Sequence, residues 1–318
     1  MTKIKVLCGF KERAGGPYFE YAPGYVFTQD RDCRDYDWLL VFDEMPIDKE
    51  ELACPRERTI LATWEPVSIK SYSSAYTHQF GHLLTNRPPE AENHPHYFLG
   101  RGYYLWFNGR RFYTDTAAAV MPPKTNLISA VCSAKRMKHT CHDARYQLIE
   151  RLNREITGFD WYGRGVRPMD KKYEVLDSYK YHVAIENHIG AHHWTEKLAD
   201  AFLSECLPFY AGDPAIFEIF PKESIIPIPI DDPDEAVRIV RAAIAEGAYE
   251  KRREAVQEAK RLILEKYNFW AQTVELIKAN SGSPVSSAGG FVYDRHVLRR
   301  RNPLAALEDL WLHLKRGL

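Results

Sequence analysis

The chain has 318 residues, of which 45% are hydrophobic and 27% are charged, so it is long enough for two domains with separate cores. Its 43 basic and 43 acidic residues give a formal net charge of zero, which excludes the basic field expected of a nucleic-acid-binding protein. No stretch approaches about 18 apolar residues and no C-x-x-C pair occurs, so we expect a cytosolic protein with reduced thiols.

The first part of the chain predicts an α/β unit over residues 1–121. Four short apolar runs have the length of buried strands and alternate with polar or helical segments, and they cover residues 4–8, 38–42, 59–62 and 81–84. The aromatic run at residues 103–107 suits either a hydrophobic core or a platform on which a sugar ring stacks. Pro122 and Pro123 then mark the domain boundary.

Acidic residues follow two of these predicted strands. Glu65 comes just after residues 59–62, at the edge of the sheet where α/β folds bind ligands. Asp43 and Glu44 occupy the equivalent place after residues 38–42. We take Glu65 as the candidate general base and keep Asp43 and Glu44 as its rivals, while a turn residue before Pro66 is the structural alternative.

Residues 122–279 predict a second α/β unit. Its expected elements are a strand at residues 126–131, a helix at 140–153, and a strand, loop, helix and strand within 179–214. Arg145 lies near the start of the first helix, where a guanidinium group can hold a pyrophosphate through two parallel hydrogen bonds. Lys135 and Arg136 in the preceding loop suit the same purpose, so this assignment stays open.

Polar residues gather at the joints of the segment 179–214. Glu186 and Asn187 stand where the strand ends, and Thr195 is placed to cap the next helix, whose first turn carries Glu196 and Lys197. A helix start binds anions through its free N–H groups and its dipole. We therefore expect a pyrophosphate at this helix start, with Lys197 reaching it and Glu196 accepting hydrogen bonds from sugar hydroxyls.

Two further patterns bear on ligands. In the turn at residues 160–165, Tyr162 and Gly163 follow a strand, and this turn either lets a nucleotide approach the backbone or simply reverses the chain. The pairs His78 with His82 and His188 with His192 have the i, i+4 spacing of zinc ligands on a helix. No H-E-x-x-H motif occurs, so we expect no protein-bound metal and keep a metal-dependent hydrolase as a minor alternative.

Three ordered segments of the second unit resemble a known family. Ile185-Glu186-Asn187, Thr195-Glu196-Lys197 and residues 207–212 resemble the F-E-N, V-T-E-K and P-V/I-x-x-G segments of the glycosyltransferase family 10 α-1,3-fucosyltransferases, in order and spacing. The similarity covers residues 125–270 and extends more faintly to about residue 60. The chain departs from the family at three positions, namely His188 for Ser, Trp194 for Val, and His193 where many members carry Tyr.

The resemblance implies an α/β fold of the GT-B type, in which two Rossmann-like domains face a cleft. It implies donor contacts from Arg145, from the turn at Tyr162 and Gly163, and from the loop at His193, and it matches Glu65 to the Glu of an E-S-P segment from which the Ser is missing. The chain lacks the N-terminal Golgi anchor of animal members, so it resembles a bacterial-type enzyme.

The implied activity is an inverting transfer of fucose from GDP-fucose to an oligosaccharide acceptor in an α-1,3-type linkage. The resemblance implies that no cofactor is required and that a divalent metal is at most stimulatory. The alternatives are a transferase for another nucleotide sugar, because His188 and His193 differ from the family, and a non-catalytic carbohydrate-binding protein with the same fold.

Residues 280–318 predict a linker and a basic tail. Residues 280–290 are low in complexity, and four leucines then recur at helical spacing between the basic clusters 299–301 and 315–316; they are Leu304, Leu307, Leu310 and Leu314. A helix that packs back on the first unit is the favoured interpretation. The alternative is that this helix makes peripheral contact with the anionic inner face of a membrane.

Overall fold

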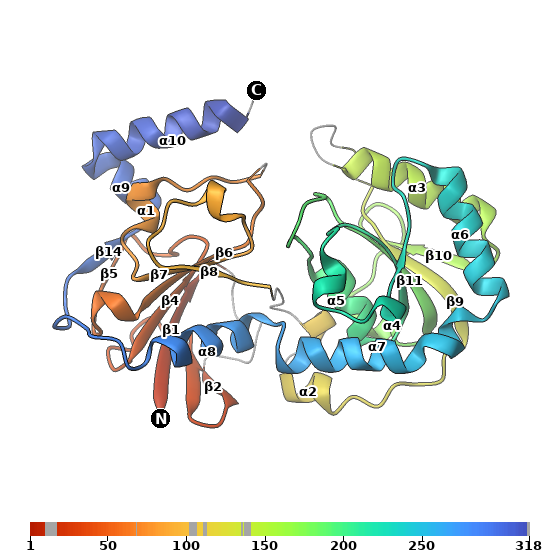
Figure 1. Cartoon of the computed structure of the whole chain (residues 1–318), viewed down its shortest axis with the longest axis horizontal. Coiled ribbons are helices and arrows are strands. Elements are labelled where there is room, and N and C mark those ends of the chain that lie inside the picture. The colour runs from red at the N-terminus through yellow and green to blue at the C-terminus, as the bar shows by residue number, and fades with distance from the viewer. Residues whose placement is uncertain are drawn as a thin grey trace. The chain divides into compact units, whose positions relative to one another are not determined.

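The computed structural model describes residues 1–9, 18–67, 69–101, 107–110, 113–134, 136 and 141–316. The chain separates into two compact units (Figure 1). Unit 1 contains Met1–Gly102 and Phe269–Leu318, and unit 2 contains Tyr103–Asn268. Each unit is built around its own largely parallel sheet, so the expected α/β fold with two Rossmann-like units, the GT-B class, is confirmed.

The sheet of unit 1 has seven strands in the order β2-β3-β1-β4-β6-β7-β8, and its neighbours are parallel except β2 with β3. The strands are β1 (Thr2–Cys8), β2 (Tyr18–Ala22), β3 (Tyr25–Thr28), β4 (Trp38–Phe42), β6 (Thr59–Thr63), β7 (His82–Thr85) and β8 (Tyr97–Leu99). All residues of β4 and β6 are buried, as expected of central parallel strands covered on both faces. The four predicted strands correspond to β1, β4, β6 and β7.

Helices cover this sheet, and aromatic side chains join one of them to it. The helices of unit 1 are η1 (Arg56–Arg58), α1 (Ser74–Thr77), η2 (Pro89–Ala91), α8 (Phe269–Asn280), α9 (Arg295–Arg301) and α10 (Pro303–Arg316). On α8, the ring of Phe269 lies 5.3 Å from the rings of Phe42 and Trp64, and Trp270 lies 4.8 Å from Phe27. These contacts bury α8 against the sheet of unit 1.

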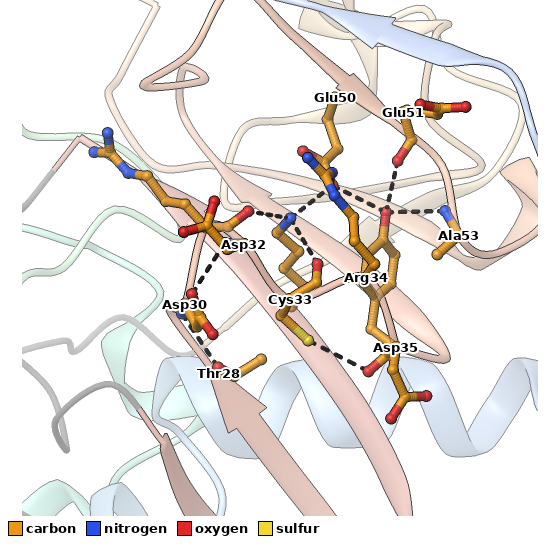
Figure 2. A network of polar contacts seen from close by, with 12 residues as sticks. Thr28, Asp30, Asp32, Cys33, Arg34, Asp35, Glu50, Glu51 and Ala53 are labelled. Carbon is orange, nitrogen blue, oxygen red and sulfur yellow. Dashed lines mark hydrogen bonds and ion pairs between the residues drawn. The ribbon is translucent and has the colours of Figure 1, made fainter.

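A charged network is buried at the edge of this core (Figure 2). The side chain of Lys5 on β1 is fully buried, and its Nζ donates to Glu50 Oε1 at 2.7 Å and to the carbonyl oxygens of Arg31 and Cys33 at 2.8 and 3.0 Å. Glu50 also accepts from Arg34 and from the Tyr36 hydroxyl. Two of the hydrogen bonds of Lys5 fasten the loop that precedes β4 to β1, and the third ties β1 to β5 (Lys49–Glu51).

The end of the chain returns to unit 1. The strand β14 (Phe291–Tyr293) pairs antiparallel with β5 (Lys49–Glu51). On α10, the carboxylate of Glu308 accepts from the backbone N and the Oγ of Ser74 at 2.8 and 3.0 Å. The favoured interpretation of the leucine-rich tail, a helix packed on the first unit, agrees with these contacts.

The sheet of unit 2 has five parallel strands in the order β10-β9-β11-β12-β13. They are β9 (Asn126–Val131), β10 (Phe159–Tyr162), β11 (Tyr179–Ile185), β12 (Leu207–Ala211) and β13 (Ile226–Pro227). Its helices are η3 (Phe107–Gly109), α2 (Tyr113–Ala117), α3 (His142–Glu155), α4 (Lys172–Leu176), α5 (Glu196–Leu203), η4 (Ile216–Glu218), η5 (Lys222–Ser224), α6 (Pro233–Ala245) and α7 (Ala248–Glu265). The elements predicted within residues 126–153 and 179–214 are all present.

The unit boundaries differ from the predicted domains 1–121, 122–279 and 280–318. The chain leaves unit 2 after Asn268, so α8 belongs to unit 1 rather than to the second domain. The reason is the aromatic packing of α8 on the first sheet, which no local sequence pattern records. In the part of the chain that the structure describes, no helix combines the length and the apolar character needed to cross a membrane.

Candidate functional site

The carboxyl edge of the unit 2 sheet brings together several predicted site residues. Glu186, directly after β11, is fully buried, and its backbone N–H donates to Ala211 O at 2.9 Å. Its carboxylate accepts from the backbone N of Thr195 at 2.8 Å and from Thr195 Oγ1 at 2.6 Å. Glu186 therefore anchors the start of α5 and has its oxygens occupied by protein donors.

Thr195 caps α5, as the sequence predicts. Its Oγ1 accepts from the backbone N–H of Lys197, and the Lys197 ammonium donates to the same oxygen at 2.9 Å. The ammonium also lies 3.3 Å from Glu186 Oε2 and 3.2 Å from Glu196 Oε1. The Lys197 side chain keeps 20% of its surface exposed, so a ligand can reach it from solvent.

These charges shift one another's pKa values. Burial acts to raise the pKa of Glu196, but the cations Lys197 and Lys172 outweigh burial and hold it at about 2. Burial acts to lower the pKa of Lys197, but Glu186 and Glu196 outweigh burial and raise it. Burial also raises the pKa of Glu186. Lys197 is therefore a fixed cation at the start of α5, and Glu196 is a carboxylate able to accept hydrogen bonds.

Arg145 on α3 reaches the same edge of the sheet. Its side chain is buried, with the residue 6% exposed; its Nη1 makes a 3.5 Å contact with Ile185 O, and its guanidinium group also interacts with the Cys132 thiol. Its Nε has no hydrogen-bond partner, and no carboxylate pairs with it among the described residues. A buried guanidinium group without a counter-ion is costly, so this position is suited to bind an anion.

The site around Arg145 and Lys197 also contains polar residues that the sequence analysis did not single out. Lys172 is paired with Asp200, which lies on the buried face of α5, and Ser129 Oγ lies 2.9 Å from Nδ1 of the buried His182. Burial lowers the pKa of His182 to about 3, so its ring is neutral. Lys172, Asp200 and His182 line a cavity with Arg145 and Lys197, of about 20 Å³, which is room for roughly one water.

The available sequence signal for this group was Asp200, because an acid interrupts an otherwise apolar helix face there. Such an interruption normally has a buried partner. Only the structure shows that the partner of Asp200 is Lys172.

The loop before α5 holds the remaining candidates of this segment. The backbone O of Asn187 accepts from the N–H of Cys141 at 3.1 Å, which ties the end of β11 to the start of α3. His193 is buried, and its ring meets the ring of His188 edge to face at 5.2 Å. His192 has a left-handed backbone with a φ of 62°. Neither histidine pair is part of a metal-binding group among the described residues.

The turn after β10 is shaped by packing. Gly163 has a φ of 144°, and a Cβ atom at this position would lie 2.2 Å from the Cys132 carbonyl oxygen, so no larger residue fits. Tyr162 is buried, with its hydroxyl 3.0 Å from that of Tyr179. These contacts account for both residues as parts of the turn, and their donor role stays a prediction.

In the loop before α3, the two alternatives to Arg145 fare differently. Arg136 is exposed and pairs with Asp143 at 2.7 Å, so a surface carboxylate already engages it. Lys135 lies outside the described residues, as do residues 102–106, which include most of the predicted aromatic platform.

In unit 1, the three acidic candidates have different environments. Glu65 follows β6 and is exposed, and its carbonyl oxygen accepts from Arg87 Nε at 2.8 Å. Asp43 adopts a left-handed φ of 66° and pairs with Lys70 at 2.6 Å. Glu44 pairs with Lys70 and Arg295, at 2.9 Å each. Both rivals of Glu65 are therefore engaged by cations.

Comparisons with known proteins agree with the resemblance seen in the sequence. Residues 121–238 match the family model described as glycosyltransferase family 10 (fucosyltransferase) C-term. No curated protein sequence matches the chain.

Solved structures show only a distant likeness. A crystal structure of an α1,3-fucosyltransferase with GDP-fucose matches 84% of this chain and 92% of its own, at 16% identity and a TM-score of 0.48. Sucrose-phosphate synthase from Thermosynechococcus elongatus matches 88% and 98%, at 9% identity and a TM-score of 0.46. A glycosyltransferase from Rickettsia africae matches 78% of each chain, at 7% identity and a TM-score of 0.48.

Proposed function

We propose that the chain is an inverting enzyme that transfers fucose from GDP-fucose to an oligosaccharide acceptor, because residues 121–238 match the family model of glycosyltransferase family 10 (fucosyltransferase). The proposed linkage is of the α-1,3 type. The single observation that best supports a nucleotide-diphosphate donor is the buried Arg145, which lacks a carboxylate partner among the described residues and lies near Lys197.

The donor side of the proposal uses the start of α5. The positive end of the α5 dipole and the Lys197 ammonium attract the diphosphate, and Arg145 supplies a second fixed cation. Glu196 stays ionised because its pKa is about 2, and it accepts hydrogen bonds from sugar hydroxyls. We propose that Lys197 and Arg145 neutralise the leaving GDP, so that no metal cofactor is required and a divalent metal is at most stimulatory.

The acceptor side of the proposal uses Glu65. As the acceptor oxygen bonds to C1 of fucose from the face opposite the phosphate, its proton passes to the Glu65 carboxylate. The C1–O bond to phosphate breaks, and its electron pair leaves with GDP, so the anomeric configuration inverts. Glu65 is exposed at the carboxyl edge of its sheet, where an acceptor hydroxyl can approach.

The direct test is a donor screen with the purified full chain. GDP-fucose, GDP-mannose and UDP-galactose are incubated with an oligosaccharide panel, and nucleotide release and product mass are measured. Turnover of GDP-fucose alone supports the proposal. Turnover of another donor supports the alternative nucleotide sugar, and GDP binding without any turnover supports a non-catalytic carbohydrate-binding protein.

Glu65→Gln tests the proposed base. The substitution keeps the size of the side chain but removes the proton acceptor, so turnover should fall by about a hundredfold to ten-thousandfold. Affinity for GDP should stay unchanged. Glu90→Gln, an exposed acid of the same unit, is the matched control and should behave as the parent. Near-normal turnover in Glu65→Gln would move the role of the base to Asp43 or Glu44.

We further propose that α10 makes peripheral contact with the anionic inner face of the membrane, where lipid-linked acceptors are found. Glu308 and Asp309 hold one side of the helix to unit 1. The opposite side exposes large apolar residues at 55–75% of their surface, namely Leu304, Leu307, Leu310, Trp311 and Leu314. The parent chain should co-sediment with phosphatidylserine vesicles and Leu310→Glu should not; equal soluble fractions would disprove the contact.

A further inference from the structure

Unit 1 contains a cavity at the amino-terminal edge of its sheet. The cavity has a volume of about 570 Å³, within the range of small-molecule sites. It is lined by residues that precede or begin β6, β7 and β8 and by the segment after α8; the full set is Arg56, Glu57, His78, Phe80, Gly81, His82, His94, Pro95, His96, Asn280, Ser283, Pro284 and Val285.

This cavity is separate from the position of the proposed base. Arg56 and Glu57 stand before β6, whereas Glu65 follows it. The five residues of β6 are separated by four steps of about 3.3 Å, so the first and last residues of the strand are about 13 Å apart. A ligand in the cavity therefore does not occupy the place where Glu65 would meet an acceptor hydroxyl.

The histidines of the cavity have defined tautomers. Nε2 of His78, His82 and His94 each meets a backbone carbonyl oxygen, of Asn93, Glu57 and Phe80 respectively, and a carbonyl only accepts, so each Nε2 carries the hydrogen. Nδ1 of His94 accepts from the backbone N–H of His96 at 3.1 Å. Nδ1 of His78 and of His82 has no protein donor among the described residues, and each keeps a lone pair for a ligand.

Rings form most of the remaining wall. His78 meets His94 at a centroid distance of 5.5 Å, and His82 meets His96 at 5.6 Å. Phe80 and the two prolines add further flat apolar surface. The charges at the cavity balance, because one arginine is matched by one glutamate and burial lowers the pKa of His82 and of His94, so that these rings are neutral at pH 7.

A segment without regular structure closes one side. Ser283, Pro284 and Val285 line the cavity, and the neighbouring Ser286 donates to Glu57 Oε2 from Oγ at 2.9 Å and from its backbone N at 3.3 Å. Asn280 and Ser283 also line the cavity as polar residues, and Nδ2 of Asn280 uses one of its two hydrogens to donate to Leu276 O at 2.9 Å. The wall thus combines flat rings, planar amide and guanidinium groups, and hydrogen-bond acceptors.

We propose that this cavity is a carbohydrate-binding site that holds a neutral mono- or disaccharide. The apolar faces of a pyranose ring pack on flat side chains, and its hydroxyl groups donate to Nδ1 of His78 and His82 while accepting from Asn280, Ser283 and Arg56. A metal ion does not fit, because three of the four rings already donate from Nε2 to carbonyls and no metal-binding group is found in the described part of the chain. The site is independent of the proposed transfer reaction.

The sign of the pH dependence separates a neutral sugar from an anion. Six titratable groups line the cavity: Arg56, Glu57, His78, His82, His94 and His96. Burial lowers the pKa of His82 and of His94, and once acid protonates these two rings, Nδ1 of His82 can no longer accept and the bond from His96 N–H to Nδ1 of His94 is lost. Binding of a neutral sugar therefore weakens as the pH falls, whereas binding of an anion strengthens.

The experiment is ligand-observed NMR on the full chain with lactose, N-acetyllactosamine and maltose, and with glucuronate and inorganic phosphate as anionic probes. At pH 8 at least one neutral disaccharide should bind, with affinity about tenfold lower at pH 4.5, a change of about 1.4 kcal/mol. Circular dichroism at both pH values verifies that the chain stays folded. The absence of disaccharide binding at pH 8, or anion binding that rises at pH 4.5, would overturn the proposal.

Two variants locate the bound sugar. Val285→Trp fills the cavity from its 43% exposed position and should abolish binding, while Val120→Trp, at a 92% exposed position in unit 2, should leave it unchanged. His96→Ala removes an exposed wall ring that makes no hydrogen bond among the described residues and should weaken binding about tenfold. Binding that survives Val285→Trp would assign the sugar to another site. Because no donor is present, this result is independent of whether fucose transfer occurs.

Discussion

Lys5 in unit 1 and Arg145 in unit 2 are both buried cations, but they differ in how completely the protein pairs their donors. Lys5 in unit 1 has no exposed surface, and its three donors are met by Glu50 and two backbone carbonyls. Arg145 in unit 2 is almost as buried, yet among the described residues it has a long carbonyl contact, a contact with the Cys132 thiol, an unpaired Nε and no carboxylate partner. A buried cation whose donors are all paired serves the fold. A buried cation with unpaired donors gains hydrogen bonds and a counter-ion when an anionic ligand binds.

The largest expected effect is on the stability of unit 1. Lys5→Met leaves Glu50 charged in a buried place, so the free energy of unfolding should fall by about 3–5 kcal/mol, measured by urea denaturation. Lys3→Met on the same strand is the matched control. Lys3 pairs with Asp35, which is 94% exposed, so its loss should cost less than about 1 kcal/mol. Equal effects of the two variants would remove the distinction between the buried and the exposed pair.

Arg145→Met should affect ligand binding more than stability. Loss of a hydrogen-bonded charge from the donor site should weaken GDP binding by about 1.5–3 kcal/mol, or roughly ten- to a hundredfold, by calorimetry. The free energy of unfolding should not fall, because the side chain gives up few hydrogen bonds in the unliganded protein.

Arg151→Met on the same helix is the control, because Arg151 pairs with Glu155 and Asp234. It should leave GDP affinity unchanged. An Arg145 variant that unfolds easily yet binds GDP as the parent does would mean that Arg145 is a structural residue like Lys5.

Lys197→Ala sharpens the comparison, because Lys197 combines both uses. It pairs with Glu186 and Glu196 and still exposes 20% of its side chain. GDP affinity should fall ten- to a hundredfold, as for Arg145, because a charged hydrogen bond is worth about 1.5–3 kcal/mol. The free energy of unfolding should fall as well, since Glu186 loses a cation while fully buried. Unchanged GDP affinity would show that the donor phosphate lies elsewhere.

The smallest effect concerns pH. His182 is buried and its pKa is about 3, below the ordinary value near 6.5, so the unfolded chain binds one more proton than the folded chain between these values. Stability therefore falls as the pH drops from about 6.5 towards 3, by at most about 1.4 kcal/mol per pH unit. His182→Gln should reduce this slope in urea unfolding between pH 6.5 and 5. An unchanged slope would mean that groups other than His182 cause the loss of stability at low pH.

The sequence by itself determined the local structure of both units. The apolar runs predicted the buried strands β4 and β6, and Thr195 predicted the start of α5, because strand burial and helix capping depend on residues within a few positions of each other. The order of polar segments from Glu186 to Lys197 also pointed to the family that the match over residues 121–238 supports.

Only the tertiary structure decided which partners these residues have. Glu186 was predicted at the end of a strand, and only the fold shows that its oxygens accept from Thr195, nine residues away. Lys5 and Glu50 are separated by 45 residues. The histidine cavity joins the starts of β6 and β7 to a segment some 200 residues later in the chain. Pairing over such separations depends on strand order and on the packing of α8, and neither leaves a periodic pattern in the sequence.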